Sequence, residues 1–476
     1  MRRFNRFMAV AAALVLAGSI GACGDDDENG NGGDGGTGGV GGTGGTGGVG
    51  GTGGGNGGTG GTGGNGGGGD FPECEGRGGE VIVDADITTD TTWCASEEIF
   101  LEDYVFVTNG ATLRIQPGTV IKGTLDTALT ITRGAKIDAN GTADAPIVFT
   151  SAEPEGDRQP MDWGGLVILG RAPINVDGDE STVDENNVEG FADTLGEKIR
   201  YGGNDPADDS GVLRYVRIEW AGEVVGEDDE LNGLTLGGVG NGTTLEYIQV
   251  HGGSDDGIEF FGGTVNAKYL VVSDVEDDSI DWDFGYTGKI QYVVIRQGPA
   301  GDHGYEGASN KAFPNSTPRA TPEIWNVTMI GGGETATKTQ RAATFKEGSA
   351  GKLGNHLVTN FKDFTFDVSG EESAAQWGTN LTVVSSLFFE NGNNEAADNT
   401  DGDFDELAAF RGVESNDFST DPQLGDFSGT NPSFVPASRL DGQAPPADGF
   451  FDVDATFIGA IGDQDWTADW TAFDAG

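Results

Sequence analysis

The chain has 476 residues, 85 of them glycine, and its 78 acidic against 26 basic side chains give a net charge of −52. So large an excess of acid leaves no basic surface to neutralise phosphates, which excludes nucleic acid as a partner. The charge also attracts cations, although it does not by itself identify a ligand.

The chain begins with three arginines, Arg2, Arg3 and Arg6, followed by an apolar run and then small residues. This order predicts a secretory signal peptide over residues 1–22. The ending "IGAC" resembles a bacterial lipobox, and the resemblance implies cleavage before Cys23 and acylation of that residue. An ordinary signal with a chance cysteine is the alternative. Acyl chains would anchor the protein on a membrane without spanning it, so we expect an exported lipoprotein at the outer membrane or cell surface.

Residues 23–70 follow as a low-complexity stretch built largely on "GGTGG" and "GGVGG". Such a composition cannot bury apolar surface, which predicts a disordered tether. A coil of this length has a root-mean-square reach of roughly 35–40 Å.

Residues 71–476 read as a single all-β domain. Cys74 and Cys94 predict a disulfide in an N-terminal cap, because the protein is expected to be exported. Short β-branched and aromatic runs, separated by Gly, Asn and Asp, then recur along the chain and predict strands. These runs cover residues 104–115, 119–123, 129–141, 146–151, 165–170, 213–222, 231–238, 245–253, 268–274, 290–298, 324–332, 356–361 and 380–392.

The spacing of tyrosines in these runs suggests the architecture. Tyr247, Tyr269 and Tyr292 recur at intervals of just over twenty residues, which is typical of a solenoid whose coils stack on one another. A propeller blade needs about 40 residues, so this period is too short for one. We therefore expect a right-handed parallel β-helix, with Trp466 and Trp470 in a C-terminal cap over the end of the stack.

The same segments carry a resemblance. "VFVTNGATLRIQPGTVIKG" and "WGGLVILGRAPIN" look like the opening coils of right-handed parallel β-helix, pectin-lyase-like proteins. "SGVLRYVRIEWAG" and the ending "GFFDVDATFIGAIGDQDWTADWTAF" resemble a group of uncharacterised bacterial surface lipoproteins. The resemblance implies a fold and a location, and no reaction.

An acidic phrase occurs twice, as "SDDGIEFFGG" (254–263) and "EDDSIDWDFG" (276–285). Aligning the two places Ile258 on Ile280 and Phe260 on Trp282 as a core ladder, since alternate strand residues share a face. Asp256 and Asp278 share the core parity, and we interpret them as turn residues whose carboxylates accept backbone N–H groups.

The remaining acids of the two phrases form an expected outer row. Two carboxylates about 5 Å apart repel by roughly 3 kcal/mol at an effective dielectric constant near 20. Three arrangements relieve this repulsion: exposure to water, retention of a proton by one member of a pair, or a shared calcium ion. The calcium interpretation uses the carboxylates of Asp255, Glu259, Asp277, Asp281 and Asp283.

A histidine on the next coil gives the row a catalytic interpretation. "QGPAGDHGYEG" places His303 on the same wall as the acidic phrases. The order resembles that of polygalacturonases, which share the β-helix fold, although the Asn-Thr and Arg-x-Lys elements of that family are missing and the nearest basic pair is Arg341 and Lys346. The catalytic interpretation uses the outer row together with this histidine: Asp255, Glu259, Asp277, Asp281 and His303.

Tether, lipid and a long rigid body all suit display on a surface. We expect a monomeric, non-catalytic protein that binds glycans or other surface components through an acidic wall, with calcium as the only cofactor. A hydrolase or lyase acting on acidic polysaccharide is one alternative, and a structural envelope spacer is another.

Overall fold

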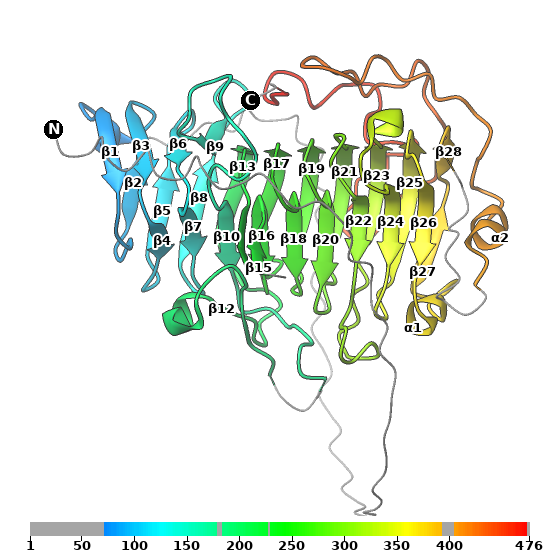
Figure 1. The fold of residues 1–476 in the computed structure, drawn as a ribbon, viewed down its shortest axis with the longest axis horizontal. Helices are drawn as coiled ribbons and strands as arrows, with labels where there is room; N and C mark the ends of the chain where they lie inside the picture. Colours follow the sequence, from blue (N-terminus) through cyan, green and yellow to red (C-terminus); the bar gives the residue numbers. More distant parts are fainter. Residues whose placement is uncertain (1–70, 179–182, 227–228, 393–403, 474–476) are drawn as a thin grey trace, which may run out of the picture. The chain divides into compact units, whose positions relative to one another are not determined.

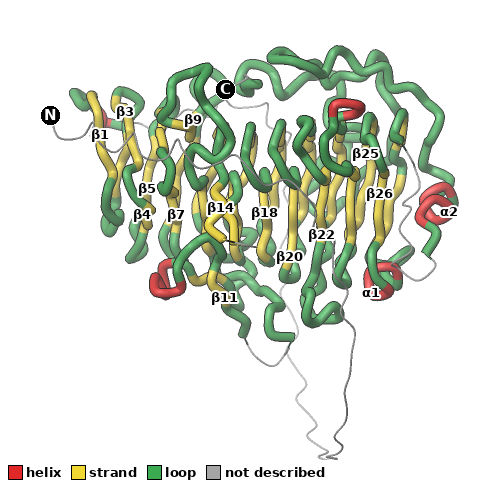
Figure 2. Tube along the Cα trace, viewed as in Figure 1, coloured by secondary structure: helices red, strands yellow, loops and turns green. Residues whose placement is uncertain are grey.

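The computed structural model describes residues 71–178, 183–226, 229–392 and 404–473. The predicted signal peptide, Cys23 and the tether (23–70) lie outside the described residues. In the described ranges the chain winds into stacked coils whose strands pair in parallel, and the helices are few and short (Figures 1 and 2). The predicted all-β parallel β-helix is confirmed.

Most of the strands belong to two sheets. The first sheet has 15 strands: β1 (Gly79–Val83), β2 (Thr91–Trp93), β3 (Glu97–Leu101), β5 (Thr112–Ile115), β6 (Val120–Gly123), β8 (Lys136–Asn140), β9 (Ile147–Ser151), β13 (Gly211–Glu219), β17 (Thr244–His251), β19 (Asn266–Ser273), β21 (Lys289–Arg296), β23 (Glu323–Ile330), β25 (Gly351–Thr359), β27 (Leu381–Val384) and β28 (Leu387–Phe389). The second sheet has 9 strands: β4 (Tyr104–Val107), β7 (Ala128–Ile131), β10 (Leu166–Leu169), β16 (Leu234–Gly237), β18 (Ile258–Phe261), β20 (Ile280–Asp283), β22 (His303–Gly307), β24 (Arg341–Phe345) and β26 (Phe364–Val368).

Short hairpins and short helices lie outside the two large sheets. Two short antiparallel hairpins pair β11 (Asn186–Asn187) with β12 (Arg200–Tyr201), and β14 (Glu223–Gly226) with β15 (Asp229–Leu231). The helices are α1 (Glu371–Ala374), α2 (Glu406–Arg411) and the 3-10 turns η1 (Pro72–Cys74), η2 (Asp193–Lys198) and η3 (Gly333–Thr335). No helix in the described ranges is both long enough and apolar enough to span a bilayer.

The long strands of the first sheet bend at their tyrosines. Tyr247 and Tyr269 have left-handed backbones, with φ of 56° and 61°, and the pairing of β17 with β19 skips them. Such a backbone costs a non-glycine residue about 1–2 kcal/mol. The rings of Tyr215, Tyr247, Tyr269 and Tyr292 stack on one another at centroid distances of 4.3, 4.2 and 4.8 Å, which offsets part of that cost. One tyrosine period is one coil, as predicted.

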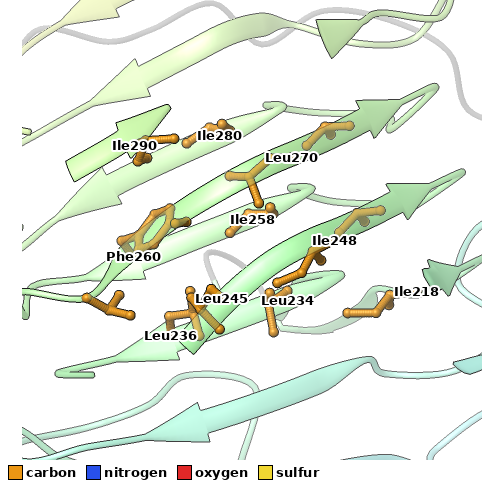
Figure 3. Packing of buried hydrophobic residues seen from close by; sticks show 14 of the residues in the cluster. Ile218, Leu234, Leu236, Leu245, Ile248, Ile258, Phe260, Leu270, Ile280 and Ile290 are labelled. Atoms are coloured by element: carbon orange, nitrogen blue, oxygen red, sulfur yellow. The ribbon is translucent and has the colours of Figure 1, made fainter. Parts of the chain in front are cut away.

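The core lies between the two sheets. Ile258 pairs with Ile280 and Phe260 with Trp282 on adjacent strands, and all four are almost completely buried. Figure 3 shows Ile258, Phe260 and Ile280 stacked with the aliphatic residues of the neighbouring coils. The predicted core ladder is confirmed, and it fixes which residues of β18 and β20 point outward.

The end of the chain runs along the first sheet rather than over the end of the stack. Residues 417–473, which we call the C-terminal strap, return from the last coils toward β13 (Figure 1). Trp470 packs edge-on against Tyr215 and Tyr247, and Trp466 packs against Tyr269. The capping role expected for the two tryptophans is therefore corrected: they cover the exposed side of the tyrosine stack.

Other residues cover the last coil. Phe410 of α2 stacks on Phe366 of β26 at a centroid distance of 4.8 Å, and Trp377 packs edge-on against Phe410. At the opposite end, Cys74 and Cys94 form the predicted disulfide.

Candidate functional site

The acidic phrases lie on neighbouring strands of the second sheet. Glu259 of β18 pairs with Asp281 of β20, which pairs in turn with Glu306 of β22. Because Phe260 and Trp282 point into the core, these three carboxylates lie on the outer face of the sheet. The acidic wall is defined as this row together with the aspartates of the turns before β18 and β20, which are Asp255, Asp256, Asp277 and Asp278.

Two groups of carboxylates meet within the acidic wall. Oxygen atoms of Asp256, Glu259 and Asp281 lie within 4.8 Å of one another, and so do those of Asp255, Asp256 and Asp277. Asp256, a residue of the turn before β18, belongs to both groups and so links the predicted outer residues. Asp283 belongs to neither group, and its carboxylate accepts a hydrogen bond from the backbone N–H of Phe284.

Asp256 and Asp278 do serve the backbone, but across coils. The backbone N–H of Asp278 donates to Asp256 Oδ1 at 2.9 Å, and that of His303 donates to Asp278 Oδ1 at 2.7 Å. Each carboxylate thus accepts a hydrogen bond from the following coil rather than from its own turn. The interpretation as backbone acceptors holds, and the donor differs.

Glu259 is more buried than an outward position suggests. Its side chain points away from the core, yet the residue is only 7% exposed. Asn232, which directly follows β15, donates from Nδ2 to Glu259 Oε2. Water therefore does not relieve the repulsion at Glu259, and that expectation is corrected for this residue. The chain that follows the β14–β15 hairpin lies against its side chain.

Burial and mutual repulsion raise the pKa values of the wall. Burial raises the pKa of Asp256, Glu259 and Asp281 well above the usual range, and neighbouring carboxylates raise it further. Burial, followed by the charge of Asp277, raises the pKa of Asp255 to about 7. None of Asp256, Glu259 and Asp281 forms an ion pair with a basic side chain in the described part of the chain. Without a cation, burial and mutual repulsion therefore favour the protonated forms of these carboxyl groups.

His303 lies on the same wall, as predicted, in an acidic setting of its own. Its Nδ1 lies 2.8 Å from Asp278 Oδ1, 3.6 Å from Asp302 and 3.9 Å from Glu306. Although burial lowers the pKa of His303, these carboxylates, Asp278 above all, raise it to about 9. The carboxylates therefore favour the protonated imidazole, whose positive charge offsets part of theirs.

Three basic side chains border the wall. Arg341 of β24 pairs in register with His303, and its Nη1 lies 3.3 Å from His303 Nε2. Lys346 donates to Glu306 at 2.6 Å, and Lys338 donates to Asp277 at 3.0 Å. The sequence pattern did not reveal this arrangement, because 38 residues separate His303 from Arg341, well over one short period.

Comparison with known proteins gives one result. The family model of the pectate-lyase-like beta helix domain matches residues 85–433, which include every strand of the acidic wall. No curated protein and no solved structure matches the chain.

Proposed function

Because the chain belongs to the family of pectate-lyase-like beta helix domains, we propose that it is a non-catalytic surface protein whose acidic wall holds calcium and, through it, binds acidic glycans. The observation that carries this proposal is the group of Asp256, Glu259 and Asp281, whose oxygen atoms lie within 4.8 Å of one another.

The choice of ion follows from the donors. Calcium takes about six to eight oxygen ligands at flexible geometry and accepts several carboxylates at once. One oxygen of Asp281 is buried and has no hydrogen-bond partner among the described residues, and the same holds for one oxygen of Asn232 beside Glu259. A calcium ion would offset the repulsion among the carboxylates and displace the protons that they otherwise retain.

The basic side chains near each carboxylate group decide where on the acidic wall calcium binds. The group of Asp278, His303 and Glu306 is already balanced by the protonated imidazole and by Lys346. A protonated imidazole has no lone pair to offer a metal ion. Among the described residues, the group of Asp256, Glu259 and Asp281 has no such basic partner, so calcium binds there.

The glycan class follows from the ion. A net charge of −52 repels an acidic polysaccharide, whereas a bound calcium with open coordination positions attracts its carboxylates. An ion held by Asp256, Glu259 and Asp281 would lie at the outer face of a sheet, along which a long polymer can cross several coils.

The test is retention on immobilised polygalacturonate. We expect the wild-type protein to be retained in calcium and released by EGTA, and Asp281→Asn to pass through in both. Glu276→Gln is the matched control, because Glu276 is an exposed neighbour that belongs to no carboxylate group. Equal retention of the wild type in calcium and EGTA would reject the proposal.

A second candidate function, cleavage of an acidic polysaccharide, is favoured by one observation. Asp256, Asp278, His303 and Arg341 occupy equivalent positions on four successive coils. Two acids, an imidazole and a guanidinium follow in the same order in the polygalacturonases that these coils resemble. Asp255, with a pKa of about 7, suits a general acid near neutral pH.

Cleavage is tested by incubating the protein with polygalacturonate and measuring new reducing ends and unsaturated ends. The cleavage function predicts release that Asp278→Asn abolishes and Glu276→Gln preserves. The binding function predicts no release from either protein, so the two candidates give opposite results.

We also propose that the protein is exported and anchored by acyl chains at Cys23, from the leading arginines, the apolar run and "IGAC". Feeding expressing cells a labelled fatty acid should label the wild type and leave Cys23→Ala unlabelled. Labelling of both proteins to the same extent would contradict anchoring at this residue.

A further inference from the structure

A cavity of about 690 Å³ lies between the first sheet and the C-terminal strap. Its floor comes from the ends of β17, β21 and β23 and the turns that follow them, and its roof from residues 427–430 and Phe473. None of its lining residues belongs to the carboxylate groups of the acidic wall. The volume falls within the range of small-molecule sites in proteins.

Aromatic and balanced polar groups line this cavity. Trp220, Phe427 and Phe473 supply aromatic surface. Arg296 forms an ion pair with Asp274, so these two opposite charges cancel, and Glu334 adds one further acidic group to the lining. The cavity therefore lacks the net positive charge that would select an acidic ligand.

Three polar atoms of the lining side chains are buried without a hydrogen-bond partner among the described residues. They are two donors, Trp220 Nε1 and Arg296 Nε, and one acceptor, Gln297 Oε1. The amide nitrogen of Gln297 is already engaged, because it donates to the backbone carbonyl of His303. An unpaired buried polar group destabilises the empty site, so a ligand that pairs with such groups gains affinity.

The strap forms part of the site. Arg296 donates from Nη1 to the carbonyl of Gly429 at 2.8 Å, and its guanidinium lies over the ring of Phe473 at 4.8 Å. These contacts hold both roof segments over the ends of the strands, so the roof is built by the fold.

We propose that this cavity is a second ligand site that binds a neutral sugar. Donors, an acceptor, aromatic faces and cancelled charge match the hydroxyl groups and apolar faces of an uncharged pyranose, and they disfavour a uronate. The site is independent of the calcium-dependent function proposed for the acidic wall, because it shares no residue with the carboxylate groups.

The test is saturation-transfer NMR and calorimetry with cellobiose, maltose and lactose, and with digalacturonate as the anionic comparison, all in EGTA. At least one neutral disaccharide should bind. Phe427→Ala, which removes part of the aromatic lining, and Thr430→Trp, which fills the space beside it, should each weaken that binding by about tenfold or more.

Phe450→Ala is the matched control, because Phe450 is a half-buried strap aromatic that contacts Lys268 and does not line the cavity. Its affinity for the sugar should equal that of the wild type. Three results would overturn the proposal: no binding of any neutral disaccharide, tighter binding of digalacturonate, or binding that neither cavity variant weakens. If the titrations are repeated in calcium, binding of the sugar in calcium but not in EGTA would assign it to the acidic wall instead and would also overturn the proposal.

Discussion

For single residues of the acidic wall, burial matters more than the count of charges. Glu276 and Glu259 are both glutamates of the two acidic phrases, yet Glu276 is exposed and Glu259 is 7% exposed. Burial is the largest cause of the raised pKa of Glu259, and the neighbouring acids add to it. Residue type and parity therefore identify the wall, whereas the packed neighbours determine its protonation.

The raised pKa values predict how stability depends on pH. Asp255 has a pKa of about 7 against a reference of 3.8, so between these values the folded state binds more protons than the unfolded state. Stability is then fully present at low pH and is lost as the pH rises through the folded-state pKa. Asp256, Glu259 and Asp281 shift in the same direction.

In EGTA, the thermal midpoint should therefore fall as the pH rises from about 5 to about 8, as measured by scanning calorimetry. Asp281→Asn should flatten this slope, because the amide does not ionise. Calcium should flatten it too, since the ion compensates the carboxylates that lose protons. A midpoint that rises across this interval in EGTA would contradict the raised pKa values.

Among the structural elements, the tyrosine stack determines how the coils bend. Tyr269 stacks on Tyr247 at 4.2 Å and on Tyr292 at 4.8 Å while holding a left-handed backbone. Further along the stack, Asn326 and Asn355 take the same bend, with φ of 58° at both. Asparagine tolerates this conformation better than most residues, so the bend needs either an asparagine or the compensation of stacking.

We predict that Tyr269→Ala lowers the free energy of unfolding more than Tyr269→Asn does. Both variants lose three ring contacts, with Tyr247, Tyr292 and Trp466, worth about 0.5–1.5 kcal/mol each, but only asparagine eases the left-handed backbone. Urea denaturation of the two variants and the wild type measures the difference. Equal losses would show that backbone strain at this bend is negligible.

The C-terminal strap gives a second prediction at this scale. Trp470 is 1% exposed, and Trp470→Ala should cost about 3–5 kcal/mol in packing against the tyrosine stack. Hydrogen exchange should then speed up in residues 417–473 while the strands of the second sheet stay protected. Val453→Ala, at an exposed strap position, is the control and should leave exchange unchanged. Uniform acceleration across all coils would show that the strap and the coils unfold together.

Taken as a whole, the molecule shows where a sequence pattern is informative and where it is not. The tyrosine period and the alternation in the acidic phrases predicted the coil length, the core ladder and the outward position of Glu259 and Asp281, because these follow from strand geometry alone. The place of Trp466 and Trp470 could not be predicted from strand geometry. A segment without strands can run along the side of the stacked coils as readily as it can cover their end.

In the candidate site, too, only the residues that lie one short period apart in the sequence could be aligned in advance. The two acidic phrases lie one short period apart, so their alignment is direct, whereas His303 and Arg341 are separated by 38 residues and meet only in the folded stack. The role of Asp256 as the link between two carboxylate groups depends on distances between turns, which the pattern does not contain.

We propose that Asp256, Glu259 and Asp281 form a cation site on the second sheet. Titration calorimetry of calcium into chelator-treated protein tests it most directly. We predict saturable binding with a dissociation constant of about 10⁻⁵ to 10⁻³ M, abolished in Asp256→Asn and Asp281→Asn and unchanged in Glu276→Gln. An absence of binding heat, together with equal thermal midpoints in calcium and EGTA, would contradict it.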